Sequence, residues 1–196
     1  MRFQDAGQKK QATKALRHFI ASFEDSKDIE KWVWANLNQL ATNTNAHSRI
    51  RHEIFCELVY PTLKAGYGAD DFTSTLWLAK LSQNLYQAPN IHQELAWVSE
   101  MELLYQCHAL KPTDNEASRL LLKGIVKFLQ YSEHEWPSGI LYGKDGATLA
   151  QCKKIAAEVE LALSLDKNAE YTVFLKRYTK KLTQYQVKLK QKKLKK

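Results

Sequence analysis

The chain has 196 residues, of which 44% are hydrophobic and 11% aromatic, enough for one folded domain with a sizeable core. Seven glycines and four prolines are too few for a disordered chain or a turn-rich all-β fold. The formal net charge is +8, but ten basic residues follow Glu170, and the rest of the chain carries 19 basic against 21 acidic residues. The net charge therefore gives no argument for a nucleic-acid-binding fold in the first 170 residues.

No run of about 18 apolar residues is present, so we expect no membrane-spanning helix. The first residues, MRFQDAGQKKQATKAL, are polar and lack the apolar core of a secretory signal. The three cysteines, Cys56, Cys107 and Cys152, are odd in number and widely spaced, which is typical of reduced thiols rather than of a disulfide framework. These features predict a cytoplasmic protein.

Hydrophobic residues recur at steps of three and four along the first part of the chain. The stripe from about Gln8 to Phe23 and the stripe from Ile29 to Leu40 each predict an amphipathic helix. Trp34 falls outside the second stripe, so we expect it either at the edge of the core or as an anchor for a partner.

Two further helices are predicted before the middle of the chain. Ser48 fits an N-cap for the first, which Pro61 bends or ends. Asp70 or Asp71 fits an N-cap for the second, which stops at Ala88-Pro89. Asn90 is then in place to cap the helix that follows.

The stretch from Glu94 to Pro137 is the clearest structural signal in the sequence. It predicts one long helix, a sharp corner and a second helix, because both halves carry apolar residues at helical spacing. Pro112 disfavours the helical conformation at Lys111 and so ends the first helix. Thr113, followed by Glu116 three residues later, fits a capping box that starts the second.

The corner ALKPTDNEA, residues 109–117, resembles the junction between tetratricopeptide repeats, and LSLDKNAE, residues 163–170, is a weaker echo of it. The two corners, at residues 112 and 166, are 54 residues apart rather than one period of about 34 residues. The Trp, Gly and Tyr positions of a full repeat do not line up. The resemblance implies stacked helical hairpins rather than a closed bundle and assigns no family.

Residues 138–146, SGILYGKDG, hold three glycines and a short apolar run, which indicates an ordered excursion or a small hairpin between helices. A helix from about Ala147 to Leu165 follows. The last helix carries tyrosine and leucine at steps of four and three from Tyr171 to Leu189, which is a heptad pattern. The apolar face of this helix either packs on the rest of the chain or binds a second copy or another protein. In the third alternative the helix does not pack on anything.

These elements predict an all-α fold of about eight helices in antiparallel hairpins, arranged as a solenoid-like stack or an irregular bundle. We expect residues 1–170 to form one helical domain. Residues 171–196 then form a long basic C-terminal helix, which docks on the domain at its start and is frayed at its lysine-rich end by charge repulsion.

No set of residues predicts a catalytic, metal or cofactor site. His52 and Cys56 lie four residues apart, as a Cys/His nucleophile or half of a metal site requires, but a second ligand pair is missing. The loop from Gly139 to Asp145 fails as a phosphate loop, because it is one residue short and has an aspartate where a hydroxyl is needed. No arginine is followed by a histidine at the spacing of HEPN-type ribonucleases.

Two groups of residues are candidates for binding. His134, Trp136, Tyr142 and Lys144 follow one another around the end of a helix and the glycine-rich loop, and we expect them to form a partner-binding surface. The acid-free C-terminal helix supplies candidates for contacts with nucleic-acid phosphates, namely Lys188, Lys190, Lys192 and Lys193.

The leading hypothesis is a cytoplasmic protein-interaction module without catalytic activity, because several aromatic residues are not fully used by the helix stripes: Trp34, Trp77, Trp136 and Tyr142. The second is a nucleic-acid-associated protein that binds through residues 176–196. The third is an enzyme of unknown class that uses the face of His52 and Cys56 or the loop at 133–144. A homo-oligomer formed through the seam from Tyr171 to Leu189 stays open.

Overall fold

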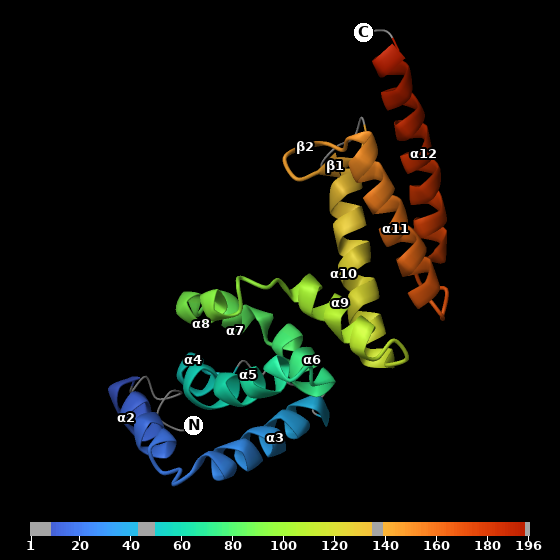
Figure 1. The fold of residues 1–196 in the computed structure, drawn as a ribbon. Coiled ribbons are helices and arrows are strands. Elements are labelled where there is room, and N and C mark those ends of the chain that lie inside the picture. The colour runs from blue at the N-terminus through green and yellow to red at the C-terminus, as the bar shows by residue number, and fades with distance from the viewer. Residues whose placement is uncertain (1–8, 43–49, 135–138, 195–196) are drawn as a thin grey trace. The chain divides into compact units, whose positions relative to one another are not determined.

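The computed structural model describes residues 9–42, 50–134 and 139–194, and within these ranges the chain is all-α, as predicted. In the same ranges, β-structure is limited to a short antiparallel hairpin of β1 (Leu141–Tyr142) and β2 (Asp145–Gly146). The chain divides into two compact units, residues 1–110 and residues 111–196, and each is described by itself (Figure 1). None of the helices in the described ranges combines the length and apolar character needed to cross a membrane.

The first unit is built around helix α6. In chain order its helices are α2 (Lys9–Ile20), α3 (Ser26–Thr42), α4 (His52–Ile54), the π-helix η1 (Phe55–Val59), α5 (Tyr60–Gly68), α6 (Phe72–Lys80), α7 (Ser82–Tyr86), α8 (Pro89–Glu94) and α9 (Glu100–Leu110). Helix α6 is central because every residue from Ser74 to Ala79 is buried, and α5 and α9 both pack against it. Leu63, Leu78 and Leu103 supply fully buried side chains from these three helices.

Helices α2 and α3 are joined by three aromatic rings. The ring centroid of Phe19 lies 5.2 Å from those of both Phe23 and Trp32, and Phe23 lies 5.8 Å from Trp32. Such offset and edge-on pairs stabilise by about 0.5–1.5 kcal/mol beyond the burial of their area. The helix predicted from about Gln8 to Phe23 is thus present as α2, with Phe23 just beyond its end.

Pro61 lies inside a continuous helical run and does not end it. Proline has no N–H to donate, and its ring crowds the carbonyl of residue 57. The chain widens immediately before it into η1, where the N–H of Tyr60 donates to the carbonyl of Phe55, five residues back. The prediction that Pro61 bends or ends a helix is therefore replaced by a local widening that keeps Phe55, Leu58 and Val59 buried.

The helix starts of the first unit agree only in part with the sequence. Asp71 caps α6, as one of the two predicted candidates, by accepting a hydrogen bond from the N–H of Ser74 at 2.7 Å. Asn90 does not cap a helix, because α8 already begins at Pro89, a residue suited to a first turn. Ser48, the third predicted cap, lies outside the described residues.

The second unit consists of α10 (Asn115–His134), α11 (Leu149–Leu165) and α12 (Thr172–Leu194), which pack as consecutive neighbours. Figure 1 shows α11 running opposite to α10 and α12. Each helix buries an apolar face: Leu121, Ile125 and Leu129 on α10; Cys152, Ile155 and Val159 on α11; Leu175, Tyr178 and Leu182 on α12. Between α10 and α12, the hydroxyl oxygens of Ser132 and Tyr178 are 2.7 Å apart.

Side-chain caps start and connect these three helices. Asp114, and not Thr113 as predicted, caps α10, since its carboxylate accepts hydrogen bonds from the N–H groups of Glu116 and Ala117 at 3.1 and 3.0 Å. Thr148 and Gln151 form a capping box at the start of α11. The buried carboxylate of Asp166 connects α11 to α12 by accepting from three donors: Glu170 N, Tyr171 N and Thr172 Oγ1.

Candidate functional site

The predicted partner-binding residues lie around the end of α10 and the β-hairpin. His134 is the exposed last residue of α10, and Lys144 is exposed in the turn between β1 and β2. Tyr142 is half-buried, and its ring meets Phe128 of α10 edge-on at 6.3 Å. Trp136 lies outside the described residues. The contact of Tyr142 is explained by packing, and partner binding at this place stays a prediction.

The predicted phosphate-binding lysines lie on α12. Lys188, Lys190 and Lys192 are exposed, and Lys193 belongs to the same helix, although its side chain is outside the described set. The predicted seam is buried within the second unit at Leu175, Tyr178 and Leu182, and is half-buried at Tyr171, Tyr185 and Leu189. A nucleic-acid role for the lysines and an oligomer formed through the seam stay predictions.

His52 and Cys56 are close, but their surroundings oppose nucleophilic chemistry. The Cys56 sulfur lies 3.6 Å from Nε2 and 3.8 Å from Nδ1 of His52. Burial raises the pKa of the Cys56 thiol, and the carboxylates of Glu57 and Glu53 raise it further. A nucleophilic cysteine needs a lowered pKa. Within the described ranges, no three His, Cys, Asp or Glu side chains converge as a metal site requires.

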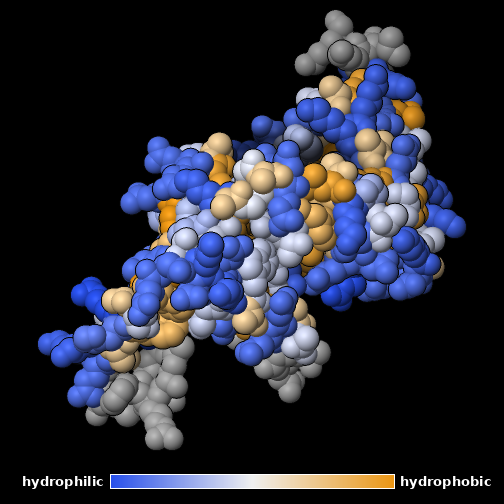
Figure 2. All heavy atoms as spheres, turned by 60° about the horizontal axis from the view of Figure 1, so that its bottom comes forward, coloured by the Kyte–Doolittle hydropathy of each residue, from blue (hydrophilic) through white to orange (hydrophobic). Residues whose placement is uncertain are grey.

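Hydrophobic residues reach the surface in patches between hydrophilic ones (Figure 2). Among the described residues, the large exposed hydrophobic side chains include Tyr86 and Trp97 in the first unit and Tyr131 and Val173 in the second. Trp77, which the sequence analysis set apart from the helix stripes, belongs to the core instead: it is 8% exposed, and the Lys80 ammonium lies 4.1 Å from its ring centre.

The predicted long helix starting at Glu94 is interrupted, because α8 ends at Glu94 and α9 begins only at Glu100. Between them, Ala96 and Trp97 have φ angles of 52° and 60°, the left-handed region that costs a non-glycine residue about 1–2 kcal/mol. The carbonyl of His92 accepts hydrogen bonds from the N–H groups of Leu95 and Trp97 and holds this turn. Ser99 and Glu102 then cap α9 through mutual hydrogen bonds of 2.8 and 3.2 Å.

This turn presents an aromatic surface that we name the Trp97 corner, made of Tyr86, His92 and Trp97. Trp97 is 55% exposed and Tyr86 is 41% exposed. The His92 ring lies between them, with centroids 5.2 Å from Tyr86 and 5.1 Å from Trp97. Nε2 of His92 is 2.8 Å from the carbonyl of Val98, and the Tyr86 hydroxyl accepts a hydrogen bond from the N–H of Glu100 at 2.9 Å. The corner is therefore a fixed surface.

The chain around the Trp97 corner is acidic. Residues 81–106 contain three glutamates and no lysine or arginine. Hydrogen bonds from Lys64 and Tyr60 lower the pKa of Glu94, and those from the N–H and hydroxyl of Ser99 lower the pKa of Glu102. Glu100 is exposed three residues after Trp97, and its N–H donates to the Tyr86 hydroxyl, so the aromatic surface carries negative charge at its edge.

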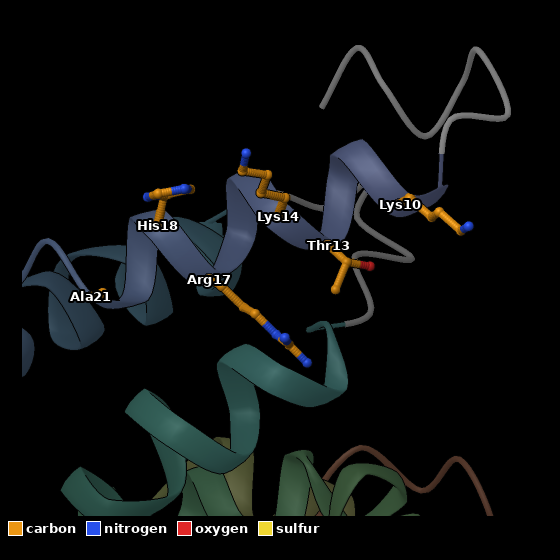
Figure 3. A pocket seen from close by; sticks show the side chains of 6 residues that line it. All are labelled: Lys10, Thr13, Lys14, Arg17, His18 and Ala21. Carbon is orange, nitrogen blue, oxygen red and sulfur yellow. The ribbon is translucent and has the colours of Figure 1, made fainter.

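A hollow of about 580 Å³ lies along α2 and is lined by Lys10, Thr13, Lys14, Arg17, His18 and Ala21. Figure 3 shows that these side chains do not converge: Lys14 and His18 point to one side of the helix, whereas Arg17 points to the other. The hollow is therefore an open basic surface, and its side chains do not converge on one ligand position.

A second hollow of the first unit, of about 440 Å³, lies between α3, α5 and α6. Trp34 forms part of its wall together with Ile29 and Pro61, and it is half-buried. Of its acidic residues, Asp71 already caps α6. The position of Trp34 fits the edge-of-core alternative and leaves its ring partly open to a partner.

The sequence held one signal for the Trp97 corner. Ser99 and Glu102 have the spacing of a capping box, which marks a helix start inside the segment predicted to be continuous. Comparisons with protein-family models, curated proteins and solved structures found no match for this chain.

Proposed function

We propose that the chain is a cytoplasmic protein-interaction module without catalytic activity, and that it holds its partner at the Trp97 corner. The observation that carries the proposal is the exposure of Trp97 on a left-handed backbone that hydrogen bonds hold in place. Backbone strain of this kind clusters at ligand clamps and other functional sites, and tryptophan is enriched among binding hot spots. None of the three cysteines, all of which lie in the described residues, forms a disulfide, and this supports the cytoplasmic location.

The partner is a protein segment that carries an arginine or lysine beside an apolar side chain. The rings of Tyr86 and Trp97 offer faces to a cation, which at exposed sites contributes about 0.5–1 kcal/mol. The exposed carboxylate of Glu100 adds electrostatic attraction, and no lysine or arginine of residues 81–106 opposes it. Charge complementarity therefore favours a basic segment over an acidic one.

The test compares tagged full-length variants in cells that naturally contain the protein. We expect a partner to be recovered with the wild type and with Val173→Ala, but not with Trp97→Ala. Val173 is the control, because it is an exposed hydrophobic side chain, at 83%, that belongs to the second unit. With the purified partner, Trp97→Ala should weaken binding by about 30-fold, which corresponds to about 2 kcal/mol at a hot spot.

Two further variants probe the geometry and the charge of the corner. Ala96→Gly should leave binding intact, since glycine adopts the left-handed conformation without strain and the hydrogen bond to the His92 carbonyl still holds Trp97 in place. Glu100→Gln should weaken it at low salt and have little effect at high salt. Equal binding by the wild type and Trp97→Ala, with both proteins folded by circular dichroism, would refute the proposal. Self-association that Trp97→Ala abolishes would instead identify the partner as a second copy of the chain.

A further inference from the structure

The second unit carries a basic stripe on the outer face of α10, formed by Arg119, Lys123, Lys127 and Tyr131. These residues follow one another at steps of four, so their positions rise by about 6 Å each along the helix. All four are exposed, and they lie opposite the buried face of Leu121, Ile125 and Leu129. The stripe arises because basic residues are gathered on one face of α10. The nearly neutral total charge of residues 1–170 does not reveal it.

The three cations of the stripe have no carboxylate partner among the described residues. No acidic residue occurs from Ala117 to Ser132. The hollow beside Arg119 includes Asp166 and Glu170, but the carboxylate of Asp166 already accepts three hydrogen bonds. From Ala117 to Ser132 the charged side chains are therefore all positive, and the nearest carboxylates in sequence, Glu116 and Glu133, flank this stretch.

Helix α12 extends this positive surface at the far end of the stripe. The carboxylate of Glu133, two residues after Tyr131, forms ion pairs with the Arg177 guanidinium at 2.8 Å and with the Lys181 ammonium at 3.3 Å. Two cations thus more than neutralise the one carboxylate at that end. Lys176 and Lys180 are exposed on the same helix, which has no acidic residue. The stripe and α12 together present cations with an exposed tyrosine ring among them.

We propose that the second unit binds single-stranded nucleic acid along this stripe. Regularly spaced cations suit the phosphates of a strand, and an exposed aromatic ring among them suits a base that is not paired. A duplex offers phosphates but no free base to Tyr131. A membrane surface requires an apolar helix face beside the cations, and the apolar face of α10 is buried against its own unit. This site differs from the C-terminal lysines predicted from the sequence.

The experiment measures fluorescence anisotropy of labelled 20-nucleotide RNA and DNA single strands with the full-length chain at several salt concentrations. Lys123→Gln/Lys127→Gln should weaken binding about 25-fold at 0.1 M salt and reduce the salt slope by about 1.4. Lys153→Gln/Lys154→Gln is the matched control, because it removes two exposed lysines from α11 of the same unit and should change affinity little. Comparing the affinities for the RNA and DNA strands shows which of the two the site prefers.

Tyr131→Ala separates stacking from charge. It should weaken binding to single strands by about 5- to 150-fold and leave both the salt slope and duplex binding unchanged. No measurable binding by the wild type at low salt would overturn the proposal. So would equal losses in the stripe and control variants, or a loss confined to Lys188→Gln/Lys190→Gln/Lys192→Gln. Binding to anionic vesicles without binding to single strands would also overturn it and point to a membrane surface.

Discussion

Three places in the described chain hold non-glycine residues in the left-handed region, and they differ in what surrounds them. Asp70 and Ala169 are single residues with φ of 55° and 54°; Asp70 follows the end of α5, where this conformation is common, and Ala169 lies in the turn between α11 and α12. Ala96 and Trp97 are consecutive, and the second has a large exposed ring. Ala96 directly follows the C-cap Leu95 of α8, so helix termination explains its conformation as well. Trp97 is left-handed beyond that position and has an exposed ring, and the proposed binding role rests on this difference.

Asp114 links stability to pH. The N–H of Ala117 lowers the pKa of its carboxyl group, burial opposes this, and Lys111 and the N–H of Glu116 add to the lowering. A group whose pKa is lowered on folding stabilises above its unfolded pKa of about 4, and this stabilisation is lost as pH falls through the folded pKa. Asp114→Asn keeps a capping oxygen but does not titrate.

We therefore expect Asp114→Asn to be less stable than the wild type at pH 7, and the difference to shrink towards zero as pH falls below about 4. Asp114→Ala, which removes the cap, should cost about 1 kcal/mol at pH 7. Urea unfolding followed by circular dichroism at pH 7, 5 and 3 measures both effects. A difference between wild type and Asp114→Asn that stays constant over this range would contradict the assignment.

A buried hydrogen bond with a defined direction joins α10 to α12. Ser132 donates its hydroxyl proton to the carbonyl of Leu129 at 2.8 Å, so Tyr178 must donate to Ser132. Burial raises the pKa of Tyr178 to about 12, which keeps this donor protonated at all ordinary pH values. Tyr178 is fully buried, and its hydroxyl has no access to water as an alternative partner.

Ser132→Ala should consequently be more destabilising than Tyr178→Phe. The serine change leaves the tyrosine hydroxyl buried without an acceptor, which costs about 1–3 kcal/mol, whereas the tyrosine change leaves Ser132 bonded to Leu129 and costs about 1 kcal/mol. The double variant should be less destabilised than the sum of the two single variants. Urea unfolding of all four proteins gives the comparison, and the reverse order of the single variants would refute the assigned direction.

Periodicity predicted the elements better than it predicted their ends. The all-α class and helices such as α2 and α11 follow from apolar steps of three and four, because burial of one face selects the helical period. The same steps continue through Leu95 and Val98, where the chain is not helical. The spacing of apolar residues does not reveal two residues with left-handed backbone angles, so the sequence analysis missed the Trp97 corner.

The choice between neighbouring capping residues was also beyond the sequence. Thr113 and Asp114 both fit, and the three-dimensional path after Pro112 decides which side chain reaches the free N–H groups of α10. The basic stripe, in contrast, was within reach of the sequence, because the second helix predicted between the corner and Pro137 is present as α10 from Asn115 to His134. Steps of four along this helix place its three cations on one face.

The distribution of tryptophan makes the two units separately observable. Four of the five tryptophans, Trp32, Trp34, Trp77 and Trp97, belong to residues 1–110, and Trp136 belongs to the second unit. In a Trp136→Phe background, tryptophan fluorescence therefore reports only on the first unit, whereas circular dichroism reports on both.

Adding Ser132→Ala to that background should lower the midpoint of part of the circular dichroism transition and leave the fluorescence transition unchanged. This follows if each compact unit unfolds by itself. Thermal and urea unfolding with both probes provide the measurement. Equal shifts of both signals would show that the units unfold together.

The order in which helices pair has a consequence for how the chain acquires its structure during synthesis. In the second unit, most helix contacts join α10 to α11 and α11 to α12 and so close short loops, whereas the hydrogen bond between Ser132 and Tyr178 forms only when α12 is present. Such local topologies fold in about microseconds to milliseconds. The first unit instead joins α6 to α9 across two intervening helices, so its core closes only after Leu110 has left the ribosome. The core of the first unit must wait for its last helix, whereas α10 and α11 of the second unit can pair before α12 emerges.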